Sequence, residues 1–395
     1  MSFKYDFEKL KKAILFNTVE VLPTDPTQLD EEIQNLVYHA NLSGQKIRHY
    51  IGFEISGQVH IGTGIASALK IKKLQEAGVN CSIWLADYHT YINNKLDGKL
   101  DTIRKVSNNY FGPVMLKCCE VVGCDISLIE ILKAESVYQS IVNDNTFWNF
   151  DMQIGKELTL SRVLKSVSIM GKDAGENVEF TTLRYPVMQV ADAFFMQTHL
   201  VHAGIDQRKC HVLMREVSTK LDKNFAINIG GKNIKPIAIH HKLLLGLEKP
   251  IHVEGSDTSE VSKMSKSKPD SAIWVHDSFE EILRKLKRAY CPQPRPEQSL
   301  EEIQNEQSLN PILDWCKYMI YPAGKDIFIE RKAEWGGNVS FDSYDDLESV
   351  YFEGKLHPMD LKSGVAKCLA DWFEPIREYT KMNQEGLELV NMYRK

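Results

Sequence analysis

The stretch Tyr50-Ile51-Gly52-Phe53-Glu54-Ile55-Ser56-Gly57-Gln58-Val59-His60-Ile61-Gly62-Thr63-Gly64 decides the fold class of this 395-residue chain. It predicts a short buried strand at 48–53, a Ser-Gly turn, and a helix over 61–77 that ends at Gly78. An apolar strand at 81–86 completes a β-α-β unit. In such units ligands bind at the carboxyl end of the first strand, where the start of the helix offers unpaired N–H groups to an anion.

The composition is that of an ordinary globular protein, with 43% hydrophobic and 26% charged residues. The net charge of −5 means that any nucleic acid must be met by local basic patches rather than by the overall field. The eight cysteines include no C-x-x-C pair, so we expect reduced thiols and no zinc. No signal peptide and no long apolar run is present, so we expect a soluble, cytoplasmic protein without a membrane partner.

Periodicity and turn residues predict an α/β fold: a Rossmann-like parallel sheet with a helical insertion, followed by a mostly α-helical C-terminal domain. We expect residues 1–45 to form an N-terminal extension of two helices. We expect residues 46–255 to form the Rossmann-like domain. Within it, residues 126–182 show no strand-like alternation and are expected to form a mostly helical insertion. We expect residues 256–277 to form a loop and linker, and residues 278–395 to form the helical domain.

A second chemical signal is Lys263-Met264-Ser265-Lys266-Ser267-Lys268-Pro269. Serine favours turns over helices, and lysines on a loop can neutralise charge as it builds on a polyphosphate leaving group. The alternative is an ordinary solvated basic loop. For His60 the alternative is a helix-start residue that satisfies local backbone groups.

The pair formed by His60-Ile61-Gly62-Thr63 and, about two hundred residues later, Lys-Met-Ser-Lys-Ser resembles the two signatures of class I aminoacyl-tRNA synthetases. The second signature matches in full, whereas the first departs at Thr63, where that family most often has a second histidine. The resemblance implies that His60, Lys263, Lys266 and Ser267 are catalytic. It implies ATP as a substrate, bound by His60, Gly62, Gly64, Lys263, Met264 and Lys266. We expect Mg²⁺ to arrive with ATP, without a dedicated carboxylate cage.

The segment Tyr185-Pro186-Val187-Met188-Gln189-Val190-Ala191-Asp192 places Tyr185, Gln189 and Asp192 on one face of a predicted helix over 185–195. The rest of this helix is apolar, so we expect the polar stripe to line a buried pocket rather than a solvated face. The turn at 204–209 contributes a further amide, Gln207.

These segments resemble the tyrosyl-tRNA synthetases of the archaeal and eukaryotic type, from about Tyr50 to the C-terminus. The resemblance implies that Tyr50 and Asp192 bind the phenol of L-tyrosine, and that Tyr185, Gln189 and Gln207 hold its ammonium group. Gly52, Ala86 and His89 would complete the pocket wall. The alternative is that Tyr50 is a strand-end aromatic residue and Asp192 a surface acid.

The same resemblance implies tRNA(Tyr) as a partner and a homodimer. Contacts with the acceptor stem would come from Arg162, Lys165 and Arg208, for which the alternative is solvated cations. Contacts with the anticodon would come from Trp335, His357 and Asp360. Trp335 would stack on a base; its alternative role is a core aromatic residue.

The activity implied is that of a tyrosine–tRNA ligase, which forms tyrosyl-adenylate and pyrophosphate and then transfers tyrosine to the 3′-terminal adenosine of tRNA. A tryptophanyl enzyme of the same fold and a catalytically silent RNA-binding relative are the rival interpretations.

Overall fold

The computed structural model describes residues 4–171, 179–249, 264 and 269–393. Contacts divide the chain into two units. Unit 1 comprises Met1–Ser56, Lys70–Gly112 and Asp125–Lys242, and unit 2 comprises Gly57–Leu69, Pro113–Cys124 and Leu243–Lys395. The helices α3 (Ser67–Glu76) and α6 (Gly112–Val121) cross this division.

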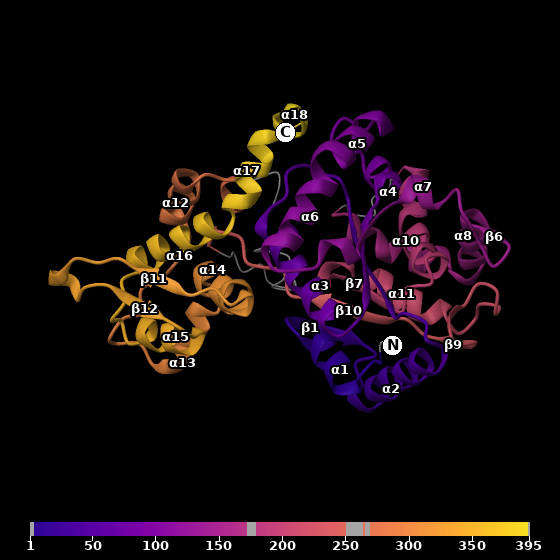
Figure 1. The fold of residues 1–395 in the computed structure, drawn as a ribbon, viewed down its shortest axis with the longest axis horizontal. Coiled ribbons are helices and arrows are strands. Elements are labelled where there is room, and N and C mark those ends of the chain that lie inside the picture. Colours follow the sequence, from indigo (N-terminus) through magenta and orange to yellow (C-terminus); the bar gives the residue numbers. More distant parts are fainter. Residues whose placement is uncertain (1–3, 172–178, 250–263, 265–268, 394–395) are drawn as a thin grey trace. The chain divides into compact units, whose positions relative to one another are not determined.

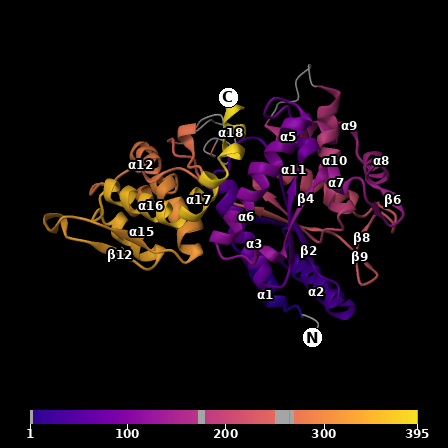
Figure 2. The same ribbon diagram turned by 45° about the horizontal axis from the view of Figure 1, so that its top comes forward.

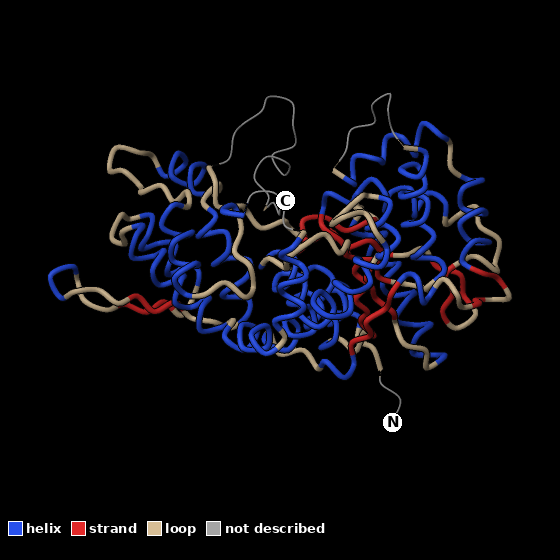
Figure 3. The backbone as a smooth tube through the Cα atoms, turned by 90° about the horizontal axis from the view of Figure 1, so that it is seen from above, coloured by secondary structure: helices blue, strands red, loops and turns tan. Residues whose placement is uncertain are grey.

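The described residues of unit 1 form a six-stranded sheet, drawn in red in Figure 3. Its strand order is β1 (Thr18–Leu22), β10 (Ile237–His241), β7 (Leu200–Gly204), β2 (Arg48–Phe53), β3 (Asn80–Leu85) and β4 (Ile129–Lys133). Every neighbouring pair is parallel except β1 with β10. The strands β3 and β7 are buried along nearly their whole length, because helices cover both faces of a parallel sheet.

The strand order reverses at β2, and this reversal positions the site. After β2 the chain adds β3 and β4 on one side, and it later adds β7 and β10 on the other. Ligands of open α/β sheets bind outside the carboxyl ends of the strands at such a switch point. The segments that follow β2 and β7 therefore flank the expected site.

One face of the sheet presents Tyr50, Val201 and Ala238 from neighbouring strands to a core that α8, α10 and α11 complete. The helices α1 and α2 lie side by side near the N-terminus (Figure 2). A π-helical turn at Ser107–Phe111 joins α5 to α6. The helices of unit 1 not yet bounded are α1 (Phe7–Leu15), α2 (Pro26–Ser43), α4 (Asp87–Ile92), α5 (Leu100–Val106), α7 (Ala134–Val137), α8 (Phe147–Glu157), α9 (Leu160–Ser166), α10 (Arg184–Phe195) and α11 (Arg208–Val217).

Two predictions about unit 1 were wrong. Residues 18–22, expected to be helical or linking, form the edge strand β1, because a short β-branched run can pair with β10. Residues 126–182, expected to lack strands, contain β4 and a hairpin of β5 (Ile141–Val142) and β6 (Asn145–Thr146). As an edge strand with an exposed glutamate, Glu130, β4 lacks the continuous apolar run that identified its neighbours.

Unit 2 contains helices and a small hairpin (Figure 1). Its helices are α12 (Phe279–Arg288), α13 (Leu300–Gln307), α14 (Pro311–Trp315), α15 (Tyr344–Phe352), α16 (Pro358–Trp372), α17 (Glu374–Met382) and α18 (Gln384–Met392). The hairpin strands β11 (Ile327–Ile329) and β12 (Val339–Phe341) correct the expectation that residues 278–395 are helical apart from loops.

The helix α16 organises the C-terminal part of unit 2. A Cβ at Gly364 would lie 2.7 Å from Ile329 Cγ1, so only glycine lets α16 approach β11 this closely. The buried Lys362 Nζ donates to the carbonyl oxygens of Lys287 and Ala289 at 3.1 and 2.8 Å. This lysine satisfies carbonyl groups at the end of α12 that have no partner within the helix.

Unit 1 also contains a hairpin of β8 (Ile227–Ile229) and β9 (Lys232–Ile234), which follows α11.

Candidate active site

A buried carboxylate, Asp192 on α10, lies among other buried polar side chains of unit 1. The hydroxyl of Tyr138 donates to Asp192 Oδ1 at 2.6 Å, and His89 Nε2 lies 3.7 Å from Asp192 Oδ2. Burial raises the pKa of Asp192 well above its usual range, against the opposing effect of the hydrogen bond from Tyr138. A solvated surface acid would show neither feature, so the alternative interpretation of Asp192 as a surface acid is excluded.

Tyr50 from β2 contributes to the same environment. Its side chain is buried, and burial followed by the nearby charge of Asp192 raises the pKa of its phenol well above 10. Tyr50 therefore remains a neutral hydrogen-bonding group at neutral pH. Burial lowers the pKa of His89 to about 4, so its ring is also neutral. Both ring nitrogens of His89 are buried without a hydrogen-bond partner among the described residues.

A second polar group surrounds Tyr185. Its hydroxyl donates to Glu54 Oε1 at 2.9 Å, and Asn93 Nδ2 donates to the same oxygen at 2.7 Å. Gln189 Nε2 donates to Gln207 Oε1 at 3.3 Å, which joins α10 to the turn after β7. In the described part of the chain Gln189 Oε1 is buried and unpartnered. Buried polar atoms without partners are rare in native proteins, and here they indicate a polar ligand.

The pocket wall depends on two small residues. A Cβ at Gly52 would lie 3.3 Å from Trp84 Cδ1 and 3.5 Å from Tyr50 Cε2, so glycine keeps room between these two rings. Ala86 is buried where β3 passes into α4. The edge of the His89 ring packs on Tyr185 with centroids 4.6 Å apart. The structure thus brings all eight predicted tyrosine-binding positions into unit 1.

Sequence reasoning missed three polar residues of this pocket: Glu54, Asn93 and Tyr138. Glu54 directly follows β2, so the rule that sites lie at the carboxyl ends of strands could have identified it. Tyr138 follows β4, but the same rule could not be applied there because β4 was itself not predicted. The Tyr138 ring is stacked on Phe147, with centroids 3.5 Å apart, and is parallel to Tyr88.

The turn that contains His60 belongs to unit 2 and is fixed by backbone pairing. Ile61 N–H donates to the Ile273 carbonyl at 3.0 Å, and Val275 N–H donates to the Val59 carbonyl at 3.1 Å. Thr63, the position that departs from the family signature, contacts the histidine directly: its N–H lies 3.2 Å from His60 Nδ1 and its hydroxyl 3.0 Å from His60 Nε2.

The two glycines of this turn differ. A Cβ at Gly64 would lie 2.7 Å from Cys118 Sγ and 2.9 Å from Val59 Cγ1, so Gly64 permits the close packing of the helix that follows. Gly62 is half-buried, and a Cβ there would lie 3.2 Å from the His60 ring and 3.7 Å from Met264 Sδ. Met264 is buried beside this turn, whereas Lys263, Lys266 and Ser267 lie outside the described residues.

The cations predicted to contact the acceptor stem lie on α9 and α11 of unit 1. Arg162 forms an ion pair with Glu216, and Arg208 pairs with Glu20 at 2.7 Å. Lys165 is exposed. Both arginines therefore already have carboxylate partners, which an RNA phosphate would have to displace.

The anticodon candidates lie in unit 2. Trp335 is 61% exposed at the tip of the β11–β12 hairpin, which Figure 3 shows projecting from the helices of that unit. This exposure excludes the alternative role as a core aromatic residue. Gly336 and Gly337 both have left-handed φ angles, +94° and +70°, which glycine adopts without strain. His357 caps α16 by accepting the Met359 N–H at 3.1 Å, and Asp360 lies in the first turn of the same helix.

None of the helices in residues 4–171, 179–249 and 269–393 is long and apolar enough to cross a membrane. The same part of the chain holds no group of three or more side chains suited to a metal ion.

Comparison with known proteins assigns the family. The model of the class I tRNA synthetases (W and Y) matches residues 42–374. A tyrosine–tRNA ligase of Pyrococcus abyssi is 42% identical, with 92% of this chain and 95% of the relative covered. The tyrosyl-tRNA synthetase of Pyrococcus horikoshii, solved with L-tyrosine, has a TM-score of 0.84 at 40% identity and covers 98% of this chain and 100% of its own. A tryptophanyl-tRNA synthetase of Aeropyrum pernix, at 17% identity and a TM-score of 0.58, covers 93% and 84% and shares the fold. The chain belongs to the class I tRNA synthetases of the tryptophan and tyrosine group.

Proposed function

We propose that this chain is a tyrosine–tRNA ligase and that its unit 1 pocket selects L-tyrosine through Asp192. The observation that carries the proposal is a buried carboxylate with the neutral hydroxyl groups of Tyr138 and Tyr50 in its environment. A phenol can donate to this carboxylate and accept from a neighbouring hydroxyl. Phenylalanine would leave the same buried groups unpaired, at a cost of about 1–3 kcal/mol for each.

The other end of the substrate meets the group around Tyr185. Gln189 Oε1, buried and unpartnered among the described residues, accepts a hydrogen bond from the ammonium group. Gln207 holds the Gln189 amide in place, and Glu54 supplies a negative charge next to the Tyr185 hydroxyl. Selection therefore needs both ends of the amino acid: a phenol at Asp192 and a cation at this second group.

The first reaction step is attack of the substrate carboxylate on the α-phosphate of ATP, which forms tyrosyl-adenylate and releases pyrophosphate. The carboxylate is already ionised, so the step requires positioning and charge stabilisation rather than a general base. We assign phosphate and adenosine contacts to His60 and to the backbone near Gly62 and Gly64. Lys263, Lys266 and Ser267 stabilise the leaving pyrophosphate. Mg²⁺ enters with ATP, and we assign it no protein ligand.

The second step transfers tyrosine to the 3′-terminal adenosine of tRNA(Tyr). Arg162, Lys165 and Arg208 are assigned to the acceptor stem, and Trp335, His357 and Asp360 to the anticodon. An exposed indole on a hairpin fixed by two glycines is suited to base stacking. We assign the tyrosine-selecting role to the predicted domain of residues 46–255 and anticodon recognition to residues 278–395.

We also propose that the ligase is a homodimer. Trp148 and Met152, one helical turn apart on α8, are 48% and 60% exposed, and Ile141 of the adjoining hairpin is 68% exposed. Large apolar side chains gathered on a surface indicate an association site. Light scattering should give twice the chain mass for the wild type and the chain mass for Trp148→Glu; a monomeric wild type would contradict the dimer.

Aminoacylation tests the main proposal. Total tRNA from an archaeal source should be charged with radiolabelled tyrosine and not with tryptophan, and the charged species should hybridise to a tRNA(Tyr) probe. Charging with tryptophan would support the rival enzyme. Absence of charging by a folded protein that still binds tRNA would support the silent relative.

A further inference from the structure

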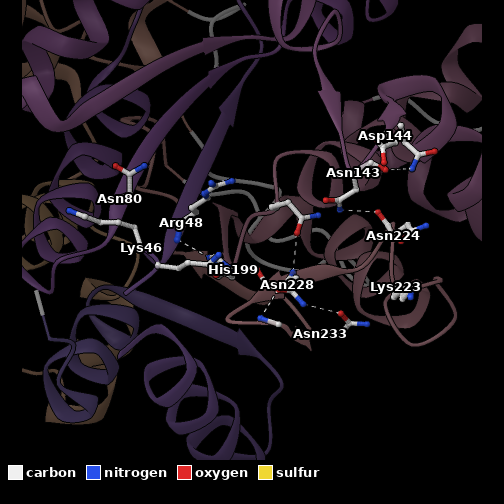
Figure 4. A pocket seen from close by; sticks show the side chains of 14 residues that line it. Lys46, Arg48, Asn80, Asn143, Asp144, His199, Lys223, Asn224, Asn228 and Asn233 are labelled. Carbon is white, nitrogen blue, oxygen red and sulfur yellow. Dashed lines mark hydrogen bonds between the residues drawn. The ribbon is translucent and has the colours of Figure 1, made fainter. Parts of the chain in front are cut away.

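A large polar cavity of about 950 Å³ lies in unit 1 at the starts of the parallel strands, away from the strand ends that flank the tyrosine pocket. Arg48 and Asn80 begin β2 and β3, and His199 immediately precedes β7. The opposite wall comes from the turn between β5 and β6 and from the β8–β9 hairpin. Figure 4 shows Lys46 and Arg48 on one side and Asn143, Asp144 and Lys223 on the other.

The charge of this cavity is unusual for an acidic protein. Three of its lining residues are cations, Lys46, Arg48 and Lys223, and a single carboxylate, Asp144, accompanies them. None of the three has an ion-pair partner in the described part of the chain. Several other cations of unit 1 do have ion-pair partners, such as Lys11 with Asp30, Arg104 with Glu135 and Arg215 with Glu32. Three cations with one carboxylate leave the lining with an excess of positive charge, and an anion bound between the cations would balance that excess.

The cavity floor, which we define as Gln197, His199 and Asn228, is held rigid by hydrogen bonds. Arg48 N–H donates to His199 Nδ1 at 2.8 Å, which leaves His199 Nε2–H to donate to the Asn228 carbonyl at 3.3 Å. Gln197 Oε1 accepts the Asn228 N–H at 3.0 Å. Burial lowers the pKa of His199 to about 4, so the floor is neutral and the positive charge stays with the three cations.

The walls are also fixed in place. Asn143 Nδ2 donates to the Asn224 carbonyl at 3.1 Å, which ties the β5–β6 turn to the segment that carries Lys223. Asn228 Oδ1 accepts the Gly231 N–H at 3.0 Å, and Asn228 Nδ2 donates to Asn233 Oδ1 at 3.2 Å. A site whose polar groups are already ordered loses less entropy when a ligand binds.

The lining chemistry defines the ligand class. Three cations favour a phosphate, and the many amide groups can exchange hydrogen bonds with hydroxyl groups. Apolar side chains, which dominate most drug-like pockets, are lacking among the lining residues, whereas the volume falls at the upper end of the range for small-molecule sites. Its concave form, an open hollow with a floor and two walls, suits a small molecule better than an extended RNA backbone, which follows a basic stripe.

We propose that this cavity binds a small phosphorylated, hydroxylated molecule, such as a sugar phosphate or a nucleoside monophosphate, at a site separate from those that bind the ligation substrates. Lys46, Arg48 and Lys223 bind the phosphate, and the asparagine side chains bind the hydroxyl groups. Asp144 disfavours anions and thereby limits the affinity.

Calorimetric titration of the full-length chain tests this site, with the active site filled by tyrosine and a non-hydrolysable ATP analogue. The probes are ribose 5-phosphate, AMP and inorganic phosphate. Ribose 5-phosphate or AMP should bind more tightly than inorganic phosphate. Lys46→Gln/Lys223→Gln should weaken that binding at least tenfold, because it removes two charge-assisted contacts. Lys9→Gln/Lys12→Gln removes the same total charge from exposed lysines on α1. This control variant should bind the probes as tightly as the wild type does.

A second variant distinguishes loss of the binding site from loss of the folded structure. Asp144→Asn should tighten binding several-fold, because asparagine tolerates the left-handed backbone at this position and removes the only lining carboxylate. Aminoacylation kcat should be the same in all these variants. Three results would overturn the proposal: no binding of either phosphorylated probe, equal binding by the Lys46/Lys223 variant, or inorganic phosphate binding as tightly as the two esters. A raised KM for tRNA in that variant without binding of either ester would instead assign the cavity to RNA.

Discussion

The tyrosine pocket of unit 1 and the hairpin tip of unit 2 are assigned to recognition of an aromatic ring, yet they are built in opposite ways. The pocket hides Asp192, Tyr138 and Tyr50 from water, and a hydrogen bond joins Tyr138 to Asp192. The hairpin exposes Trp335 and fixes only the backbone beneath it. A buried site discriminates through the cost of leaving polar groups unpaired, whereas an exposed ring contributes stacking that every base can satisfy. The comparison predicts steep selectivity between amino acids at the pocket. At the tip, removal of the indole should cause a modest loss of tRNA affinity that does not depend on the identity of the base.

The largest effect should come from the carboxylate itself. Asp192→Ala removes the acceptor for the substrate phenol and the partner of the Tyr138 hydroxyl. We expect the ratio of kcat/KM for tyrosine over phenylalanine to fall by at least 100-fold in ATP–pyrophosphate exchange. Tyr5→Phe is a matched control, since that buried hydroxyl bonds to Gly78 and Ile47 outside the pocket; it should affect stability but not selectivity. Selectivity retained in Asp192→Ala would show that the pocket is wrongly assigned.

Trp335→Ala should have the next largest effect, on the opposite side of the comparison. Loss of one stacked base costs about 1–3 kcal/mol, which corresponds to a rise of roughly 5- to 150-fold in KM for tRNA. Tyrosine-dependent pyrophosphate exchange, which needs no tRNA, should be unchanged, and Trp335→Phe should restore most of the tRNA affinity. A stacking role would be refuted by an unchanged KM, or by equal damage to the exchange reaction.

Tyr138→Phe should produce a smaller change in the pocket. It removes the 2.6 Å hydrogen bond to Asp192 and keeps the ring that stacks on Phe147. We expect KM for tyrosine to rise by up to about tenfold, in line with the net contribution of about 0.5–1.5 kcal/mol of a hydrogen bond. The pH profile of kcat/KM should shift as well, because this donor lowers the pKa of Asp192. Tyr88→Phe, in the neighbouring stacked ring, is the control; the same pH shift there would argue against a positioning role for Tyr138.

The last prediction concerns stability in acid rather than activity. Burial lowers the pKa of His49 to about 3 and of His89 and His199 to about 4. In the unfolded chain these rings take up protons near pH 6.5, so between pH 6.5 and about 4 the unfolded state binds more protons and the folded state loses stability as pH falls. Each group contributes up to about 1.4 kcal/mol per pH unit. Denaturant unfolding across this range should show that slope, and His49→Asn should reduce it; an unfolding free energy independent of pH would contradict the burial of neutral histidines.

The structural position of a segment could be predicted from the sequence where its local residue pattern reflects its place in the fold. The buried strand at β2, the turn at His60 and the polar stripe on α10 each show their role within about a dozen residues. β1 and β4 could not be found in this way, because an edge strand is defined by its pairing partner and shows no strong pattern of its own. Tyr138 was missed for the same reason, since its role depends on a stack with Phe147 and on a contact with α10 across more than fifty residues of chain. The cationic cavity joins residues 46–48 to residue 223, and no local pattern encodes such a juxtaposition.

ATP–pyrophosphate exchange with tyrosine, tryptophan and phenylalanine, each assayed alone without tRNA, tests the central claim most directly. If Asp192 and Tyr50 select a phenol, exchange should be rapid with tyrosine and at least 100-fold slower in kcat/KM with the other two. Comparable rates with tyrosine and phenylalanine, or faster exchange with tryptophan, would contradict the account.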